Sequence, residues 1–258
     1  MGNTRILAFC GKGGVGKTSI SALTVRLLSE AYPDKKILAI DADPAIGLAT
    51  ALGVSSSSTV DDIRKLFISH AESGDNKAAL EILSEAKYQI FDALKEIDNV
   101  SFLAIGRPEA SGCYCKVNAY LKEVISLLAS NFDYVVIDGE AGIEQVNRRV
   151  MEKVTHLILV SDASKKGIEV TKTIKKVAKE LSMFETDGLI LNRIDEALDV
   201  SRLDLTGLNL LSAIFDDKKM RDADIEGASI FTLDEDTAFV TGAKKALKRL
   251  GILMEEAS

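Results

Sequence analysis

Short runs of consecutive apolar residues recur along the chain and alternate with amphipathic stretches. The runs are rich in valine, isoleucine and leucine, which is typical of strands buried on both faces of a sheet. In the stretches between them, such as NAYLKEVISLLASN, apolar residues return at spacings of three and four, which predicts helices. The predicted strands are residues 5–10, 36–41, 100–105, 134–138, 156–161, 188–193 and 210–215.

This alternation of strand and helix predicts an α/β fold: a doubly wound, mostly parallel sheet with helices on both faces. The 258 residues contain no linker rich in proline or glycine, so we expect one domain over 1–258. The serine run at 55–58 predicts a loop, and its last serine or Thr59 is expected to cap a helix that begins near Asp61. Two or three helices are expected in residues 60–98, where no motif indicates a function.

Charge and composition narrow the class of protein. With 32 Lys and Arg against 39 Asp and Glu, the net charge of −7 gives no general attraction to nucleic acid or anionic lipid. The chain shows no secretory signal pattern and no apolar run of membrane-spanning length, so we expect a cytoplasmic protein that binds neither nucleic acid nor membrane. Three cysteines do not make a disulfide framework in a chain of this length, so the thiols are expected to be reduced unless they hold a metal.

A phosphate-binding loop follows the first predicted strand. The stretch GKGGVGKT satisfies the pattern G-x-x-x-x-G-K-[ST] and leads directly into a helical segment. In such a loop, backbone N–H groups surround the phosphates of a nucleoside triphosphate, Lys17 reaches the β- and γ-phosphates, and Thr18 binds Mg²⁺. The predicted nucleotide-binding residues here are Gly11, Lys12, Gly13, Gly14, Val15, Gly16, Lys17, Thr18 and Ser19.

The loop carries a second lysine, Lys12, directly after its first glycine. The pattern KGGVGKT resembles the deviant phosphate loop of the nitrogenase iron protein, MinD and ParA family. The resemblance implies that Lys12 crosses the interface of a homodimer and stabilises charge on the phosphoryl group of the partner's ATP, as an arginine finger does elsewhere. Dimer formation and ATP hydrolysis are then expected to be coupled.

Two acidic stretches extend this resemblance. AIDADPA follows the second predicted strand and VVIDGEAGIE contains the fourth, and Asp138 ends a strand as a magnesium-binding carboxylate does. By resemblance Asp41 assists the magnesium shell, Asp43 orients the attacking water, Gly142 lets the second switch move, and Asn192 hydrogen-bonds adenine, which favours ATP over GTP. The catalytic residues that the resemblance implies are Lys12, Lys17 and Asp43.

Cys113 and Cys115 form a CxC pair between the strand that ends near Ile105 and a helix expected to start near Val117. This position places them at the same edge of the sheet as the phosphate loop, where ligands of doubly wound folds gather. A closed thiolate site needs four ligands, and a symmetric dimer that brings two such pairs together provides Cys₄. Thiolates accept either Ni²⁺ or Zn²⁺.

The combination of KGGVGKT, DADP, CYC and DGEAGIE resembles the CooC-type nickel-insertion ATPases. This resemblance implies an ATP-dependent metallochaperone that delivers Ni²⁺ to apo carbon monoxide dehydrogenase or acetyl-CoA synthase. Of the other candidate ligands, Cys10 is expected in the core, and His70 and His156 are interpreted as structural or surface residues.

Two other functions stay open. A positional regulator like MinD or ParA would use the basic C-terminal stretch GAKKALKRLGILM as a surface-binding helix. However, the helical spacing of apolar residues there favours a helix packed on the sheet; these residues are Phe239, Val240, Ala243, Leu247 and Leu250. A [4Fe–4S] reductase like nitrogenase iron protein is less favoured, because the segment after Asp138 has no second cysteine.

Overall fold

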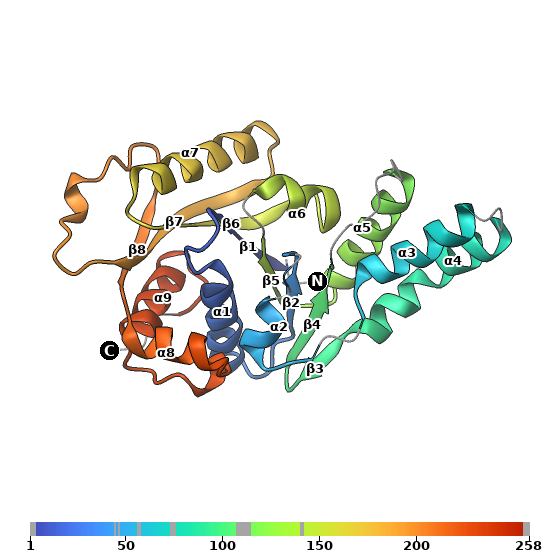
Figure 1. The fold of residues 1–258 in the computed structure, drawn as a ribbon, viewed down its shortest axis with the longest axis horizontal. Coiled ribbons are helices and arrows are strands. Elements are labelled where there is room, and N and C mark those ends of the chain that lie inside the picture. Colours follow the sequence, from blue (N-terminus) through green and yellow to red (C-terminus); the bar gives the residue numbers. More distant parts are fainter. Residues whose placement is uncertain are drawn as a thin grey trace.

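A computed structural model of the chain describes residues 4–43, 45, 47–55, 58–72, 76–106, 115–139 and 142–254. Its centre is one eight-stranded sheet (Figure 1). The strands are β1 (Arg5–Gly11), β2 (Ile37–Asp41), β3 (Lys95–Ile97), β4 (Val100–Ala104), β5 (Tyr134–Asp138), β6 (Val154–Ser161), β7 (Phe184–Ile194) and β8 (Leu210–Phe215). Their spatial order is β3-β4-β2-β5-β1-β6-β7-β8, and every neighbouring pair is parallel except β3 with β4.

The seven predicted strands are all present, which confirms the doubly wound α/β fold. The eighth, β3, lies in the region expected to be helical. It is a three-residue edge strand, and a turn at Asp98, whose φ is 50°, reverses the chain so that β3 pairs antiparallel with β4. A strand of three residues is too short to show a periodic pattern in the sequence, so β3 was not predicted. It is identified as a strand by its pairing with β4.

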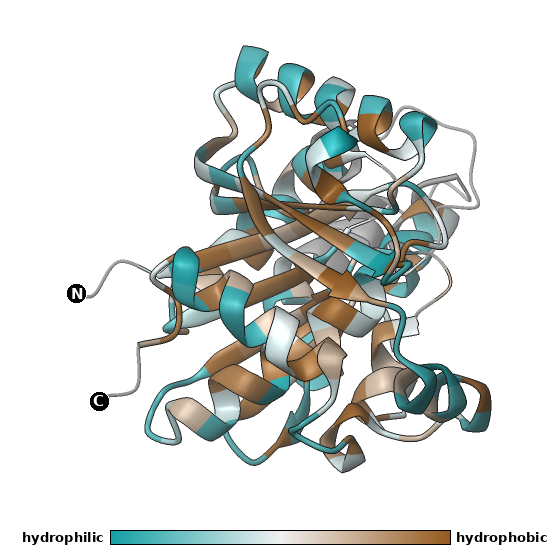
Figure 2. Cartoon of the chain, turned by 90° about the vertical axis from the view of Figure 1, so that its left-hand side faces the viewer, coloured by the Kyte–Doolittle hydropathy of each residue, from teal (hydrophilic) through white to brown (hydrophobic). Residues whose placement is uncertain are grey.

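Helices cover both faces of the sheet and bury a core on each side. The α-helices are α1 (Lys17–Ala31), α2 (Gly47–Leu52), α3 (Val60–Glu72), α4 (Asn76–Ala93), α5 (Cys115–Ala129), α6 (Ile143–Arg149), α7 (Lys165–Glu180), α8 (Lys218–Glu226) and α9 (Ala238–Arg249). Buried residues of α1, α2 and α9 form the core on one face, and those of α3 to α7 form the core on the other. Figure 2 shows the apolar strands enclosed between helices whose outer sides are hydrophilic.

Thr59 caps α3, and the helix begins at Val60. The Thr59 hydroxyl accepts a hydrogen bond from the Asp62 backbone N–H at 3.2 Å, while the Asp62 carboxylate accepts one from the Thr59 N–H at 2.9 Å. This reciprocal arrangement satisfies two backbone donors that the first turn of a helix leaves free. The predicted cap is therefore confirmed, with Thr59 as the capping residue.

The C-terminal helix α9 packs inward. Its residues Phe239, Val240, Ala243 and Leu247 are buried, and the helix contacts α1 and β8. The Thr237 hydroxyl caps it by accepting from the Val240 N–H at 3.2 Å. The interpretation of this stretch as a helix packed against the sheet is confirmed.

The parallel arrangement gathers the carboxyl ends of β1, β2, β5, β6 and β7 at one edge of the sheet. Gly11, Asp41, Asp138 and Ser161 end four of these strands, and Asn192 lies two residues before the end of the fifth. Ligands of open α/β sheets bind at this edge, which therefore contains the candidate site.

Candidate functional site

The phosphate-binding loop connects β1 to α1, as the sequence predicts. At Gly11 a Cβ atom would lie 2.0 Å from the Val160 carbonyl oxygen of the adjacent strand. Gly16 caps α1 with φ of 88°, and a Cβ there would lie 2.5 Å from Nδ2 of Asn192. Gly11 requires glycine because the backbone of the adjacent strand approaches closely. Gly16 requires glycine because its φ is left-handed and because the Asn192 side chain lies close to it.

Lys17 is the first residue of α1, and its side chain is buried. Its ammonium group donates to the backbone carbonyl of Lys12 at 3.2 Å, so the side chain folds back over the loop. A buried cation inside a ring of backbone N–H donors is the arrangement that binds the phosphates of a nucleotide.

Two carboxylates meet beside the loop. Asp41 and Asp138 are register partners on neighbouring strands, and both are fully buried. Asp138 accepts hydrogen bonds from the Thr18 hydroxyl at 2.7 Å and the Ser21 hydroxyl at 3.3 Å, both on α1. Asp41 accepts from the backbone N–H groups of Asp43 and Leu48, which ties the loop after β2 to the sheet.

Burial alters the protonation of this pair. Desolvation, reinforced by the charge of Asp138, raises the pKa of Asp41 to about 7. Desolvation also raises the pKa of Asp138 to about 6, although hydrogen bonding from Thr18 opposes the shift. Two buried anions this close favour a cation between them, and carboxylate and hydroxyl oxygens are the hard donors that Mg²⁺ prefers. Thr18, Asp41 and Asp138 therefore fit the predicted magnesium site.

Asp43 is only partly buried and borders the open cleft beside the phosphate loop. Its carboxylate accepts from the backbone N–H of Ala45 at 2.9 Å. Gly142 caps the N-terminus of α6 in an extended conformation, and a Cβ there would lie 2.5 Å from the Glu144 carboxylate. The roles of Asp43 in orienting water and of Gly142 in switch movement stay predictions.

Lys12 is bound within its own chain. Its ammonium group lies 3.3 Å from the carboxylate of Asp162, which directly follows β6, and the Lys12 side chain is 37% exposed. Partial burial acts to raise the pKa of Asp162, but hydrogen bonds from Ser164 and Lys12 lower it overall. Asp162 was not predicted, because 150 residues separate it from Lys12 and no motif marks it.

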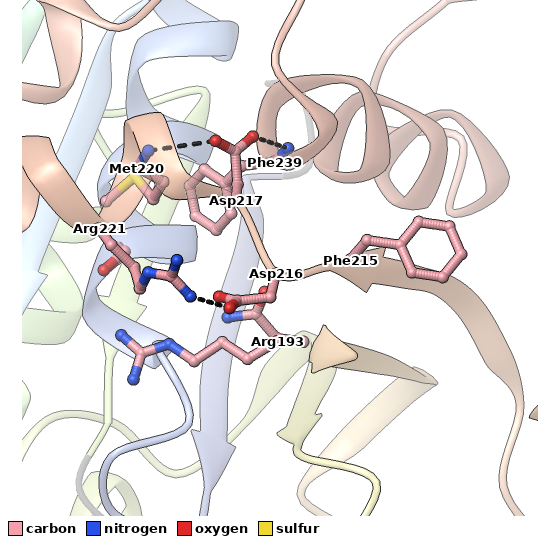
Figure 3. Close-up of a pocket in the computed structure, with 9 residues that line it drawn as sticks. Arg193, Phe215, Asp216, Asp217, Met220, Arg221 and Phe239 are labelled. Carbon is pink, nitrogen blue, oxygen red and sulfur yellow. Dashed lines mark hydrogen bonds and ion pairs between the residues drawn. The ribbon is translucent and has the colours of Figure 1, made fainter. Parts of the chain in front are cut away.

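A second pocket adjoins the phosphate loop at the ends of β7 and β8 (Figure 3). Asn192 is buried there, and its amide donates to the carbonyl of Val15 in the loop at 2.9 Å. Its role with adenine therefore stays a prediction, and the structure adds a contact that supports the loop. The pocket is lined by Ser19, Asn192, Arg193, Phe215, Asp216, Asp217, Met220, Arg221 and Phe239.

The acidic residues of this second pocket are already paired. Asp217 accepts backbone hydrogen bonds from Met220 at 3.2 Å and from Phe239 at 3.1 Å, so it joins the start of α8 to the start of α9. Asp216 forms an ion pair with Arg221, as Figure 3 shows. Asp216, Asp217, Met220 and Arg221 were not predicted, although DDKKMR directly after the predicted strand 210–215 was a usable signal.

The CxC pair falls at the border of the described residues. Cys113 lies outside them. Cys115 is the first residue of α5, so the helix begins two residues before the predicted start near Val117. In the described part of the chain, no group of three or more His, Cys, Asp or Glu side chains is arranged to hold a metal. The metal site at Cys113 and Cys115 stays a prediction.

The other candidate ligands have structural positions. Cys10 is fully buried, and burial raises the pKa of its thiol to about 12, so its predicted place in the core is confirmed. His156 is half-buried in β6, and Nδ1 lies 2.8 Å from the Thr155 hydroxyl. His70 is half-buried on α3. Within the described residues, no helix combines the length and apolarity needed to cross a membrane.

Comparison with known proteins agrees with this geometry. The family described as an AAA domain matches residues 4–185. A Methanocaldococcus jannaschii protein, named only as an uncharacterized ATP-binding protein, is 38% identical over 235 residues, which cover 89% of this chain and 92% of the relative. The carbon monoxide dehydrogenase accessory protein CooC of Rhodospirillum rubrum is 28% identical over 240 residues, covering 88% and 89% of the two chains. Among solved structures, the septum site-determining protein MinD of Pyrococcus horikoshii, complexed with Mg-ADP, has a TM-score of 0.69 at 24% identity and covers 96% of each chain.

Proposed function

Because this chain belongs to the AAA domain family, we propose that it is an ATP-hydrolysing metallochaperone that works as a nucleotide-controlled homodimer. The proposed ATPase activity rests on one observation: Lys17 and Thr18, at the end of the phosphate loop, lie close to Asp138 at the end of β5. The Thr18 hydroxyl is 2.7 Å from the Asp138 carboxylate. This is the set of groups that phosphoryl transfer requires: a phosphate cradle, a cation and magnesium ligands.

The chain's own residues have distinct roles in this proposal. Thr18, Asp41 and Asp138 hold Mg²⁺, which neutralises charge on the β- and γ-phosphates. Lys17 binds those phosphates, and Asp43 at the cleft orients the attacking water. Lys12 leaves Asp162 and reaches the partner's nucleotide, which requires breaking one partly exposed ion pair of small energy.

The metal cargo is proposed to be Ni²⁺ or Zn²⁺ held by Cys113 and Cys115 of both subunits. Support comes from the CxC sequence, from the similarity to CooC, and from the path of the chain before the pair. The N–H of Ile105, which directly follows β4, donates to the carbonyl of Asp41 at 2.8 Å. Ile105, at the start of the segment that leads to the cysteines, is thus hydrogen-bonded to Asp41, one of the proposed magnesium ligands.

Metal binding tests the cargo. The purified dimer is expected to bind about one Ni²⁺ or Zn²⁺, because four thiolates complete one tetrahedral site. Replacing both cysteines, Cys113→Ser with Cys115→Ser, should abolish binding in metal analysis. Cys10→Ala is the matched control: it removes a buried thiol far from solvent and should retain the metal. Unchanged binding in the double variant would contradict the proposal.

Hydrolysis and dimer formation test the role of Lys12. Lys12→Ala should keep ATP binding but lose most ATP turnover and ATP-dependent dimer formation, measured by phosphate release and by sedimentation. Normal turnover in this variant would exclude a role in the partner's site.

The client is proposed to be apo carbon monoxide dehydrogenase or acetyl-CoA synthase. Nickel-loaded protein with ATP should activate the apo client, whereas the double cysteine variant should not. Equal activation by free Ni²⁺ alone and by the loaded protein would argue against a delivery role.

A positional regulator like MinD is the second candidate, and the full-length likeness to the MinD fold favours it. It receives less support because the apolar face of α9, which would have to bind a membrane surface, is buried against α1 and β8. Flotation with anionic liposomes distinguishes the two: ATP-dependent binding that is lost when Lys244, Lys245 and Lys248 are changed to glutamate would favour the regulator.

A further inference from the structure

Arg193 adopts a backbone conformation that is unusual for its place in the fold. Its φ is 57°, and among the described residues only three that are not glycine have positive φ: Asp98, Ser182 and Arg193. Asp98 is in the β3–β4 turn and Ser182 lies just after α7, where turns account for the geometry. Arg193 instead lies within β7, where the pairing with β8 becomes irregular between Leu191 and Ile194. A non-glycine residue held in this region within a strand marks a site whose surroundings impose the conformation.

The irregularity redirects a side chain. Successive side chains of a regular strand point to opposite faces of the sheet. Here two consecutive residues of β7 both reach the phosphate loop: the Asn192 amide donates to the Val15 carbonyl at 2.9 Å, and the Arg193 guanidinium donates to the Gly14 carbonyl at 3.1 Å. A β-bulge beside a site re-aims a side chain in this manner.

The guanidinium of Arg193 lies between two compartments of the cleft. Arg193 lines the pocket at the ends of β7 and β8, and it also lines the cleft beside Lys17 and Thr18. Its second nitrogen lies 3.9 Å from the Asp224 carboxylate on α8, and its side chain is 46% exposed. Figure 3 shows the side chain extending beneath Arg221 at the edge of the pocket at the ends of β7 and β8. A planar cation is therefore present between the pocket lined by Asn192, the residue that the resemblance implies contacts adenine, and the cleft beside Lys17 and Thr18.

We propose that Arg193 is a nucleotide-positioning residue that holds the outer turn of the phosphate loop and presents its guanidinium to the ribose and α-phosphate portion of a bound nucleoside di- or triphosphate. The inference rests on the proposed ATP binding. Because this portion is common to ATP and ADP, Arg193 contributes equally to the binding of both, in contrast to groups that contact the γ-phosphate.

Nucleotide affinity measures this role. Arg193→Gln should weaken the binding of ATP and ADP by the same factor, about tenfold, since a hydrogen bond to a charged group is lost. Arg193→Lys keeps the charge but not the planar fork, so it should recover only part of the affinity. Titration calorimetry with Mg²⁺ present gives the dissociation constants, and Arg202→Gln, an exposed arginine in the β7–β8 connection, is the matched control with affinities within about twofold of the wild type.

Arg193→Gly separates positioning from structural support. Glycine adopts a φ of 57° without strain, so the thermal midpoint of this variant should equal or exceed that of Arg193→Gln, while its nucleotide affinity stays as low. Recovery of affinity together with stability in the glycine variant would overturn the inference, because the arginine would then act only on folding. Affinities of Arg193→Gln within twofold of the wild type would also overturn it. A wild-type chain that binds no ATP would instead overturn the proposed function and this inference with it.

Discussion

Helices α1 and α8 border the same cleft but are held in different ways. Ten of the fifteen residues of α1 are buried, whereas none of the nine residues of α8, all of which the structure describes, is buried. Residues of both helices line the cleft beside the phosphate loop. Among them, Lys17 and Thr18 belong to α1, whereas Met220 and Asp224 belong to α8. The wall formed by α1 is therefore part of the core, whereas the wall formed by α8 contains no buried residue.

The stabilisation of each wall follows from this difference. Burial of apolar side chains contributes about 1.5–3 kcal/mol for each large residue, so α1 is held by many strong contributions. In α8, Met220 and Ala223 are only partly buried against the core. Its polar contacts include a cap from Asp217 and exposed ion pairs of Lys219 and Arg221, which are individually weak. The position of α1 is thus tied to global folding, whereas α8 depends on fewer and weaker contacts.

Core truncation should show the largest difference between the two helices. Leu28→Ala removes a fully buried side chain of α1 and is expected to lower the free energy of unfolding by about 2–5 kcal/mol, since it leaves a cavity. The matched change on α8 is Ile225→Ala, whose side chain is 83% exposed, with an expected effect within about 0.5 kcal/mol. Urea unfolding of both variants measures this difference, and similar losses would contradict it.

The carboxylates beside α1 should make stability depend on pH. Burial raises the pKa of Asp41 to about 7 and that of Asp138 to about 6, so the folded state keeps protons that the unfolded chain releases above its ordinary pKa of 3.8. This contribution is fully present below pH of about 4 and is lost as the pH rises through about 6–7.

Asp138→Asn removes one of these ionisations. The nucleotide-free variant should be more stable than the wild type at pH 8, by up to about 3 kcal/mol for a shift of two units, and the gain should vanish near pH 4. Mg-ATP should stabilise the wild type far more than the variant. Chemical unfolding at several pH values measures both effects, and a gain that does not change with pH would refute the electrostatic cause.

The cap of α8 should have an intermediate effect. Asp217→Ala removes the acceptor for the Met220 and Phe239 backbone N–H groups and is expected to cost about 1–2 kcal/mol. Asp222→Ala, an exposed residue of the same helix, is the control and should change little. Equal effects of the two changes in thermal unfolding would show that capping does not hold α8.

The exposed ion pair of α8 should matter least. Lys219 lies 2.8 Å from Asp234 and both are exposed, so Lys219→Ala should lower stability by less than about 1 kcal/mol. Because ions screen exposed charges, the difference should diminish in 1 M salt. A larger loss that persists at high salt would indicate that α8 is more firmly held than its contacts imply.

The parts of the fold that were predicted are those with strong local patterns. The seven strands have continuous apolar runs, and the phosphate loop has a fixed spacing of glycine, lysine and threonine, so neither needs distant residues to be identified. Cys115 shows the limit at boundaries: the sequence places a helix after the CxC pair but not its first residue, because no strong capping residue marks the start.

Residues paired across the chain were not predicted. Asp162 binds Lys12, and Arg193 binds the Gly14 carbonyl 179 residues away, and no local sequence signal records either contact. Arg193 follows Asn192 in an ordinary strand pattern, and alternation would direct the two side chains to opposite faces. The irregular pairing of β7 with β8 overrides that alternation.

The sequence by itself determined the α/β class, the strands and the chemistry of the phosphate loop, because these depend on residue types at short, fixed spacings. Only the tertiary structure decided that Asp41 and Asp138 are fully buried register partners, that Lys12 pairs with Asp162, and that Arg193 faces the loop. These features depend on strand order and register, which bring together residues that are distant in the chain.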